Sequence, residues 1–544
     1  MPNRSPKPSR ASTRRPRARA RRGKTGSLER VLRERFGFDA LRPGQREVIE
    51  HVLAGGDTLA ILPTGAGKSL CYQLPALLLE GTTVVASPLI ALMKDQADQL
   101  EARGIDAAPL NSALTASEEE AAMRDVRHAR AEIVFATPER LQNGEFLEAL
   151  RRNRIDLFVE DEAHCISQWG HDFRPAYLEL GRALHALGDP PVLALTATAT
   201  DDVVRDIREQ LGRPDMEVVN GALYRPNLHY AVRQVSGEAA KLEALRELLE
   251  ASRGPVIAYT ATVKAAEGLA HALQEWGEKA LVYHGRLAAR TRNARQEAFM
   301  SGEARVMVAT NAFGMGIDKR DVRAIIHYQV PGSLEAYYQE SGRAGRDGKT
   351  ARCTLLYDHD DRRVQQFFLG GRGPDAAELR AVLEGVTGRI PKARVRLLSA
   401  LLRNTGLLGR RDVPHAALEE LAQEQQESHE AEREKLEQVS AYAHGARCRW
   451  KMILDYFGDE EPFERCGSCD NCRRPVAVPE EEVTRDAEPA QEEAPRVRPF
   501  RPGERVAVRR YGRGLVESVA GDRVQVSFAD GRTREFLRAY VQRA

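Results

Sequence analysis

The chain has 544 residues, 42% hydrophobic and 29% charged, which is ordinary for a soluble globular protein and long enough for three or four domains. No run approaches the roughly 18 consecutive apolar residues that a membrane-spanning helix needs, so we expect no membrane association. The net charge of +2 hides blocks of opposite sign: residues 1–27 hold ten Lys or Arg and no acid, and residues 480–493 hold seven acids and one Arg. These blocks predict a disordered basic tail over 1–27 and an acidic linker over 476–497.

The basic tail has paired arginines but no apolar segment after them, which argues against an export signal and predicts a cytoplasmic protein. Composition alone does not separate this tail from a mitochondrial presequence. Of seven cysteines, three are scattered and four lie between residues 448 and 472. This distribution favours a reducing compartment and one metal site over a disulfide scaffold.

From residue 28 onward, short Val/Ile/Leu-rich runs alternate with helical stretches. The first series of expected strands is 58–62, 83–87, 132–137, 157–162 and 192–198, and the second is 256–260, 280–284, 306–310, 324–328 and 353–357. Short apolar strands separated by helices predict parallel sheets covered on both faces. We therefore expect an α/β protein with two tandem domains, residues 28–222 and 223–360, and a nucleotide between them.

The segment 63–69, PTGAGKS, follows the first expected strand and opens a helix. Backbone N–H groups of such a loop cradle phosphates at a helix N-terminus. The residues expected to contact the nucleotide phosphates are Thr64, Gly65, Gly67 and Lys68. Ser69 is expected to bind Mg²⁺. The segment predicts ATP and Mg²⁺ as cofactors, although Leu62 stands where the general P-loop pattern has glycine.

The segment 161–164, DEAH, ends the expected strand 157–162. An acid at the carboxyl end of a strand near a P-loop is placed to hold Mg²⁺. We assign that role to Asp161, directly or through water, and activation of the attacking water to Glu162. His164 is expected to couple this site to the following loop.

The segment 339–346, QESGRAGR, lies in the second series. A guanidinium delivered from a second domain neutralises charge on the γ-phosphate when the domains close. Arg346 is the first choice for this arginine finger and Arg343 the second. The alternative for this segment is a basic surface turn.

These three segments resemble motifs I, II and VI of superfamily 2 helicases. Residues 87–89 with 94–96 resemble motif Ia, 196–198 resemble motif III, and 309–318 resemble motif V, which adds Asp318 to the expected nucleotide contacts.

Two further segments resemble the RecQ family in particular. In the first, Phe38 precedes LRPGQ at 41–45, and the resemblance implies that Phe38 stacks on adenine while Arg42 and Gln45 contact the nucleotide. The second, residues 165–175, resembles the aromatic-rich loop that senses single-stranded DNA and signals to the ATPase site. Aromatic rings there offer stacking faces for bases, although they would otherwise be core residues. The expected DNA contacts are Trp169, His171, Phe173 and Arg174.

Cys448, Cys466, Cys469 and Cys472 offer four thiolates at a spacing that suits tetrahedral structural Zn²⁺. The alternative is a redox-active CxxC pair. The surrounding residues 446–475 resemble the RecQ zinc subdomain, which implies a helical zinc-binding unit. The preceding region 361–445 is helical by pattern and longer than the resemblance implies, so it is either a small winged-helix-like insert or a helical spacer.

Only 72 residues follow Cys472, which leaves no room for the winged-helix and HRDC domains of many RecQ proteins. Residues 498–544 instead alternate short strands with glycine turns and resemble a small SH3-like or Tudor-like β-barrel. Such a barrel binds a protein, such as RNA polymerase, or nucleic acid. The winged helix often supplies the unwinding wedge in this family, so strand separation is the activity that this difference puts in question.

The resemblance implies two tandem RecA-like parallel-sheet domains, a helical zinc-binding subdomain and a small β-barrel. The expected activity is that of an ATP-dependent 3′–5′ DNA helicase, acting on single-stranded and tailed duplex DNA in recombination and repair in the bacterial cytoplasm. The alternatives are a DNA-stimulated translocase or remodeller with little strand separation, an RNA helicase, and a scaffold with an inactive ATPase site. The intact Lys68, Asp161, Glu162 and Arg346 argue against the scaffold.

Overall fold

The computed structural model describes residues 25–111, 114–167, 177, 180–314, 319–368, 373–388, 390–408, 410, 413–459, 461–474, 500–508, 512–520, 523–528, 533–537 and 541–543. The predicted tail, apart from its last three residues, and all of the predicted acidic linker lie outside these residues. The chain divides into two compact units, Met1–Val476 and Ala477–Ala544. Among the described residues, no helix is long and apolar enough to cross a membrane.

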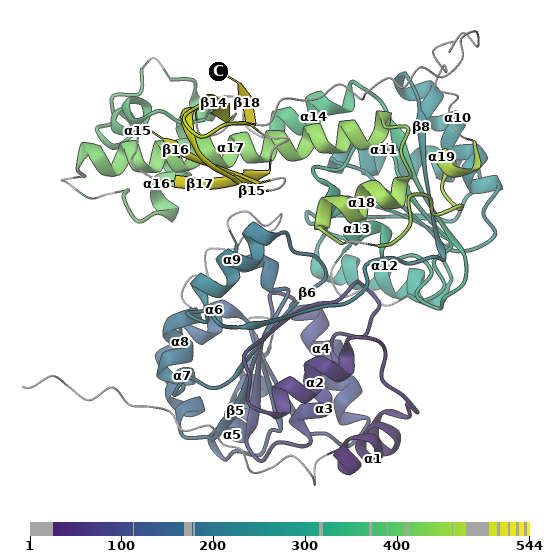
Figure 1. The fold of residues 1–544 in the computed structure, drawn as a ribbon. Coiled ribbons are helices and arrows are strands. Elements are labelled where there is room, and N and C mark those ends of the chain that lie inside the picture. The colour runs from purple at the N-terminus through teal and green to yellow at the C-terminus, as the bar shows by residue number, and fades with distance from the viewer. Residues whose placement is uncertain are drawn as a thin grey trace, which may run out of the picture. The chain divides into compact units, whose positions relative to one another are not determined.

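The first sheet has seven parallel strands in the order β3-β4-β2-β5-β6-β1-β7. Two of its inner strands, β5 and β6, are labelled in Figure 1. They are β1 (Thr58–Ile61), β2 (Thr82–Ala86), β3 (Ala107–Leu110), β4 (Ile133–Ala136), β5 (Ile155–Asp161), β6 (Val192–Thr196) and β7 (Glu217–Asn220). The five expected strands are the five inner ones. The two edge strands, β3 and β7, were not expected; their sequences, AAPL and EVVN, are only partly buried and lack a continuous apolar run.

Both faces of this sheet are covered, because successive side chains of a strand enter different cores. On β5, Leu157 and Val159 pack in one core and Phe158 in the other. The helices of the first core are α1 (Thr25–Phe36), α2 (Gln45–Leu53), α3 (Leu70–Ala76) and α4 (Ile90–Glu101). Those of the second are α5 (Ala116–Arg127), α6 (Pro138–Leu141), α7 (Gly144–Arg151), α8 (Leu180–Ala186) and α9 (Asp201–Gln210), with the 3₁₀ helix η1 (Ala163–Ile166).

The second sheet has six parallel strands in the order β10-β11-β9-β12-β13-β8. They are β8 (Leu228–Gln234), β9 (Val256–Tyr259), β10 (Ala280–Tyr283), β11 (Val306–Ala309), β12 (Ala324–His327) and β13 (Ala351–Tyr357). Its helices are α10 (Gly237–Glu250), α11 (Val263–Glu275), α12 (Ala289–Ser301), α13 (Leu334–Ser341) and α14 (Asp361–Phe368). Two tandem parallel sheets with helices on both faces confirm the predicted RecA-like α/β architecture, whereas the exact boundaries at 222 and 360 stay predictions.

The region after the second sheet is helical, with α15 (Ala376–Leu383), α16 (Lys392–Asn404) and the 30-residue α17 (His415–His444). Leu418 and Leu421 of α17 pack in a small core with α15 and α16. Val439 and Tyr442, near the other end of α17, pack in a core of the second sheet. The described residues between 373 and 444 contain no strand, so they show a helical cluster with its own core and not the strand pair of a winged helix.

The zinc-binding region holds α18 (Arg449–Phe457) and α19 (Asp470–Arg473). The smaller unit is an antiparallel sheet in the order β17-β16-β15-β14-β18. Its strands are β14 (Arg505–Val508), β15 (Gly512–Ala520), β16 (Arg523–Phe528), β17 (Thr533–Leu537) and β18 (Val541–Arg543). Its core is built mainly from valines. The short strands expected in residues 498–544 are present, and the likeness to an SH3-like or Tudor-like barrel stays a prediction.

Candidate nucleotide site and metal centre

Three predicted motifs follow neighbouring strands of the first sheet. β1 pairs with β6, and β6 pairs with β5, all in parallel. The P-loop follows β1, residues 161–164 follow β5, and residues 196–198 follow β6. Because the carboxyl ends of parallel strands lie at one edge, these segments meet where nucleotides bind in open α/β sheets.

The P-loop requires glycine at position 67. Gly67 has a φ of 82°, in the left-handed region, and a Cβ there would lie 2.8 Å from Nε2 of Gln45. That amide donates hydrogen bonds to the carbonyls of Ala66 and Gly67 at 2.9 and 3.0 Å. The Gln45 side chain therefore supports the loop through two hydrogen bonds. Its close approach to Gly67 is possible only because glycine has no side chain.

Arg42 lies on the same loop, because its guanidinium donates to the carbonyl of Gly65. The backbone N–H of Arg42 donates to Oε1 of Gln45 at 2.8 Å, which holds the Gln45 side chain beside the same loop. Phe38 is 47% exposed, which leaves its ring accessible for stacking. The structure thus brings Arg42 and Gln45 to the P-loop.

Lys68 and Ser69 make few contacts. The Lys68 ammonium donates to the carbonyl of Leu62 at 3.3 Å. The Ser69 hydroxyl accepts from Nε2 of Gln96 at 2.9 Å, which links the P-loop to residues 94–96. Oε1 of Gln96 in turn accepts from the hydroxyl of Tyr72.

Asp161 is buried, and burial raises its pKa to about 7, with a further contribution from the neighbouring Glu162 carboxylate that outweighs the opposing effect of Lys68. A carboxyl group in this state lacks compensating positive charge, and a cation close to it would restore the charged form. Carboxylate and hydroxyl oxygens are the donors that Mg²⁺ prefers, so Asp161 and Ser69 fit this ion.

Glu162 has a φ of 57°, in the left-handed region that costs a non-glycine residue about 1 kcal/mol or more. Such strain is common at functional sites. The preceding residue, Glu160, is fully buried on β5, and neither of its carboxylate oxygens has a hydrogen-bond partner among the described residues. Burial, and secondarily Asp161, raise the pKa of Glu160 well above its usual range.

His164 connects two of the motifs. Its Nδ1 lies 3.1 Å from the hydroxyl of Thr196 and 3.5 Å from Oε2 of Glu162. The Thr196 hydroxyl donates to the carbonyl of Thr198 at 2.9 Å, so it accepts from a protonated Nδ1 of His164. The DEAH segment is thereby bonded to residues 196–198.

The two predicted arginines face different neighbours. A Cβ on Gly65 would lie 3.3 Å from Cγ of Arg346, so the stem of Arg346 lies against the P-loop. Arg343 is buried, and a Cβ on Gly314 would lie 3.0 Å from one of its terminal nitrogens. In this arrangement the stem of Arg346 lies against Gly65 of the P-loop, and the guanidinium of Arg343 lies beside Gly314.

Sequence reasoning missed Arg225, which lies in the connection between the two sheets. Its guanidinium donates to the carbonyls of Gly342, Ala344 and Gly345 at 2.6, 2.7 and 2.9 Å. It also reaches the carbonyl of Thr64 in the P-loop at 3.4 Å. The only hint in the sequence is an arginine in a short connection between two predicted domains.

Five predicted residues are not tested by this geometry, because they lie outside the described residues. They are Asp318 and the four expected DNA contacts, Trp169, His171, Phe173 and Arg174.

The predicted metal ligands gather in one place. The sulfur atoms of Cys448, Cys466, Cys469 and Cys472 all lie within 4.8 Å of one another. Backbone N–H groups of Cys466, Arg449 and Cys469 donate to the sulfurs of Cys448, Cys469 and Cys466 at 3.3–3.4 Å. Donation to sulfur stabilises thiolates, and four clustered thiolates fit tetrahedral Zn²⁺.

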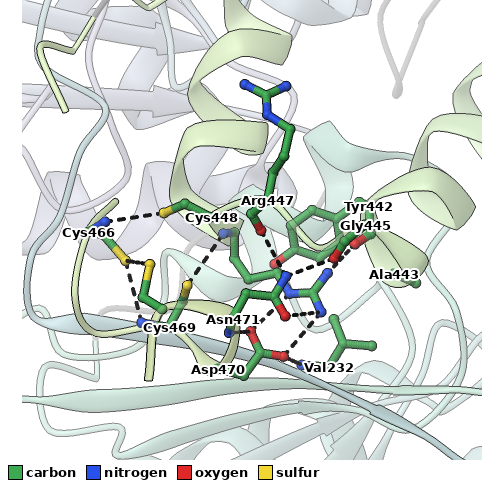
Figure 2. A network of polar contacts seen from close by, with 12 residues as sticks. Val232, Tyr442, Ala443, Gly445, Arg447, Cys448, Cys466, Cys469, Asp470 and Asn471 are labelled. Carbon is green, nitrogen blue, oxygen red and sulfur yellow. Dashed lines mark hydrogen bonds and ion pairs between the residues drawn. The ribbon is translucent and has the colours of Figure 1, made fainter. Parts of the chain in front are cut away.

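A buried ionic network joins this centre to the second sheet (Figure 2). The Arg449 guanidinium donates to both carboxylate oxygens of Asp470, at 2.9 and 3.2 Å, and to the carbonyl of Tyr442. Asp470 also accepts from the backbone N–H of Val232 on β8 at 2.9 Å. Asn471 donates to the carbonyls of Gly445 and Arg447 at 2.7 and 2.8 Å. The zinc-binding region is thus bonded to β8 of the second sheet through Asp470 and to α17 through Arg449.

Three family matches cover most of this architecture. Residues 42–207 match the DEAD/DEAH box helicase family, residues 240–348 the helicase conserved C-terminal domain, and residues 410–473 the RecQ zinc-binding family. Among solved structures, the DUF1998 helicase MrfA bound to DNA is similar, with a TM-score of 0.52 and 20% identity over 63% of this chain and 50% of that one. The Mycobacterium smegmatis helicase Lhr has a TM-score of 0.50 and 22% identity over 73% of this chain and 57% of its own. At these identities the likeness shows the fold.

The relatives are more similar in sequence. ATP-dependent DNA helicase RecQ of Bacillus subtilis is 39% identical over 84% of this chain and 68% of its own length. Probable ATP-dependent DNA helicase RecS of the same species is 38% identical over 82% of this chain and 92% of its own. RecQ of Synechocystis is 37% identical over 82% of this chain and 98% of its own. With its two helicase domains, its four-cysteine centre and these relatives, the chain belongs to the RecQ family of ATP-dependent DNA helicases.

Proposed function

We propose that this helicase moves 3′ to 5′ along single-stranded DNA and separates tailed duplexes in recombination and repair, in the bacterial cytoplasm. The observation that carries the proposal is the meeting of the P-loop, the DEAH segment and residues 196–198 at adjoining strand ends, with Arg346 of the second domain against Gly65. The direction of movement and the repair role rest on family membership.

Each residue of the nucleotide site has a distinct task in this proposal. Phe38 stacks on the adenine, while Arg42 and Gln45 support the P-loop and reach the base. Thr64, Gly65 and Gly67 surround the phosphates and Lys68 binds their terminal oxygens. Ser69 and Asp161 hold Mg²⁺, which when bound neutralises charge on the β- and γ-phosphates. Asp318 contacts the nucleotide from the second domain.

Turnover requires a base and a cation beside the γ-phosphate. Glu162 accepts a proton from the attacking water, and its left-handed backbone fixes the direction of the carboxylate. Arg346 supplies positive charge to the transferring phosphoryl group, since its stem lies against the P-loop, and Arg343 supports motif V beside Gly314.

DNA binding controls this step through His164. Its bond to Thr196 joins the DEAH segment, which carries the base Glu162, to residues 196–198, and the predicted aromatic loop begins at the next residue, Cys165. Bases stacked on Trp169 and Phe173, with His171 and Arg174 beside them, would shift this segment and so align Glu162.

The smaller unit has a separate task. Residues 498–544 recruit the helicase to a partner, for which RNA polymerase is one candidate, or to DNA. Arg496 and the residues after it include twelve arginines and five acids, which suits an acidic protein surface or phosphates.

A DNA translocase with little strand separation is the second candidate. The observation that favours it is the helical cluster at residues 373–444, whose described part lacks the strand pair of a winged helix.

One experiment separates these functions. ATPase activity is measured with single-stranded DNA and with RNA, and unwinding is measured with 3′-tailed and 5′-tailed duplexes. We expect DNA to stimulate turnover and the 3′-tailed duplex alone to unwind. Stimulation without unwinding identifies a translocase, and preference for the 5′ tail contradicts the proposed direction.

A further inference from the structure

Helix α16 carries only one sign of charge. Its 13 residues include Lys392, Arg394, Arg396 and Arg403 and no acid. Arg394 is used internally, because it donates to Glu378 and to the carbonyl of Gly373, both at 2.8 Å. The other three side chains are exposed and make no ion pair with any residue in the described part of the chain.

The three unpaired cations lie in one row. Positions 392, 396 and 403 are spaced by four and seven residues, which places them on one face of a helix over roughly 16 Å. The opposite face carries Leu398 and Leu402, which are fully buried in the core shared with α15 and α17. The fold therefore presents the basic row outward.

At its N-terminus this placement opposes the stability of the helix, whereas Arg403 in the last turn favours it. The first turn contains Lys392 and Arg394 and no acid, so cations stand at the positive end of the helix dipole. Leu397, about a third of a turn away from the row, is 47% exposed. The next helix, α17, carries eight glutamates between residues 419 and 437 against only Arg433 and Lys435, so it is strongly acidic where α16 is basic.

We propose that this face of α16 binds the phosphate backbone of duplex DNA. A rigid row of cations suits the fixed phosphates of a duplex. A surface for single strands uses aromatic stacking platforms, and residues 373–414 contain no Phe, Tyr, Trp or His. The acidic α17 repels DNA and confines the contact to α16.

The test compares two triple variants of the whole protein. Lys392→Gln/Arg396→Gln/Arg403→Gln removes the row. The control, Arg124→Gln/Arg127→Gln/Arg130→Gln, removes three exposed cations at and just after the end of α5, two of which pair with Glu145 and Asp125. Binding of blunt duplex and of single-stranded DNA is measured over a range of salt. Each lost phosphate contact lowers the slope of log affinity against log salt by about 0.9, so we expect a decrease of 2 to 3 for duplex in the α16 variant alone.

Single-stranded DNA should bind the α16 variant as it binds the wild type. An unchanged slope for duplex, or an equal decrease in the α5 control, overturns the proposal. An equal loss for single strands also overturns it, since the row would then belong to the single-strand path.

A second inference concerns Arg225 and rests on the proposed role of Arg346. The turn that carries Arg346 has three backbone carbonyls, at Gly342, Ala344 and Gly345, that accept hydrogen bonds from the guanidinium of Arg225. Asn227 adds hydrogen bonds to the carbonyls of Gly345 and Lys349 at 2.8 and 3.0 Å. Two backbone bonds also hold this turn to its domain, from the N–H of Gly345 to the carbonyl of Val322 at 3.0 Å and from the N–H of Asp347 to the carbonyl of Arg320 at 3.2 Å.

We infer that Arg225 is a positioning residue for the arginine finger. Its fork fixes the backbone from which Arg346 projects, and its fourth contact, at Thr64, ties the same turn to the P-loop. Misplacing a catalytic group by about 1 Å costs on the order of 100-fold in rate. Ground-state nucleotide binding does not depend on this alignment.

The test measures kcat and KM for ATP in Arg225→Lys and Arg225→Gln. We expect kcat to fall about 10- to 100-fold in both variants with KM nearly unchanged. Lysine keeps the charge and glutamine does not, but neither has the planar guanidinium that bonds to several carbonyls at once. Affinity for ADP with aluminium fluoride should fall in parallel, whereas affinity for ADP alone should not. Arg233→Gln, which removes an exposed arginine paired with Glu247, is the control.

Arg346→Ala separates the inference from the proposal beneath it. If Arg346→Ala loses activity and the Arg225 variants do not, the positioning role is wrong and the finger stands. If Arg346→Ala keeps its activity, the proposed finger itself is wrong. A uniform loss of ADP binding and zinc in the Arg225 variants would show a folding role and overturn the inference.

Discussion

The nucleotide site and the zinc-binding region differ in how completely their buried charged side chains are hydrogen-bonded. In the first, the Lys68 ammonium contacts one carbonyl at 3.3 Å, and Asp161 is buried with a raised pKa. In the second, the Arg449 guanidinium makes four hydrogen bonds, two of them to Asp470. In the zinc region the charged side chains of Arg449 and Asp470 form hydrogen bonds with each other. In the nucleotide site Lys68 and Asp161 form no such pair.

The difference separates activity from stability. Where side chains contribute little to folding, their removal should abolish turnover and leave the fold intact. Where they are fully bonded and buried, removal leaves partners unsatisfied and costs stability. The following predictions test whether the two regions divide in this way.

Lys68→Ala and Glu162→Gln should have the largest effect on activity. Removing a general base costs roughly 10²- to 10⁴-fold, and removing Lys68 takes away a phosphate contact, so ATPase should fall to background. Melting temperature and single-stranded DNA binding should stay near those of the wild type. Steady ATPase in either variant contradicts the assigned roles, and a large loss of stability contradicts the comparison.

Cys469→Ser should act on folding and not on chemistry. Cys469 is buried, and a structural zinc site contributes directly to folding, so we expect less zinc and a lower yield of folded protein. Metal analysis of the wild type should find about one zinc per chain. A wild type without zinc would end this assignment.

Asp470→Ala should destabilise the protein by about 3–5 kcal/mol, because it leaves the buried Arg449 charge without its partner. Asp455→Ala, in the same region, removes a half-exposed carboxylate that pairs with Arg447 and should cost about 1 kcal/mol or less. Denaturant unfolding measures both. Equal losses of unfolding free energy in the two variants would mean that the buried network stabilises the protein no more than a surface ion pair does.

Glu160→Val should have a smaller effect of opposite sign. The buried carboxyl group has no hydrogen-bond partner among the described residues, and its neighbours on adjacent strands are Ala86 and Ala194. Replacing it with an apolar side chain should stabilise the fold by about 1–3 kcal/mol and raise the melting temperature by several degrees. A lower melting temperature would show that Glu160 does have a partner in the folded protein.

Removal of residues 477–544 should change ATPase least, within about twofold, because these residues form a separate compact unit. If the truncated protein keeps ATPase but no longer unwinds a tailed duplex, the smaller unit takes part in strand separation and is not an accessory.

The sequence was most informative where function depends on local spacing. The P-loop, the DEAH segment and the four cysteines are contiguous or nearly so, and each was found from its own residues. Contacts across long separations were not found: Arg225 bonds to Gly342, 117 residues away, and Asp470 bonds to Val232, 238 residues away. The strands β3, β7 and β8 were also missed, because edge strands are partly solvated and lack the apolar runs of inner strands.

One of those edges gives the zinc region a second consequence. β8 is the outermost strand of its sheet, and an uncovered outer strand is a template for pairing with another chain. Here the indole of Trp450 donates to the carbonyl of Leu228 at 3.0 Å, and Asp470 accepts from the N–H of Val232. Loss of the metal would uncover this edge in every molecule at once. The first effect of metal loss would then be self-association, which increases with protein concentration. Loss of catalysis would follow it.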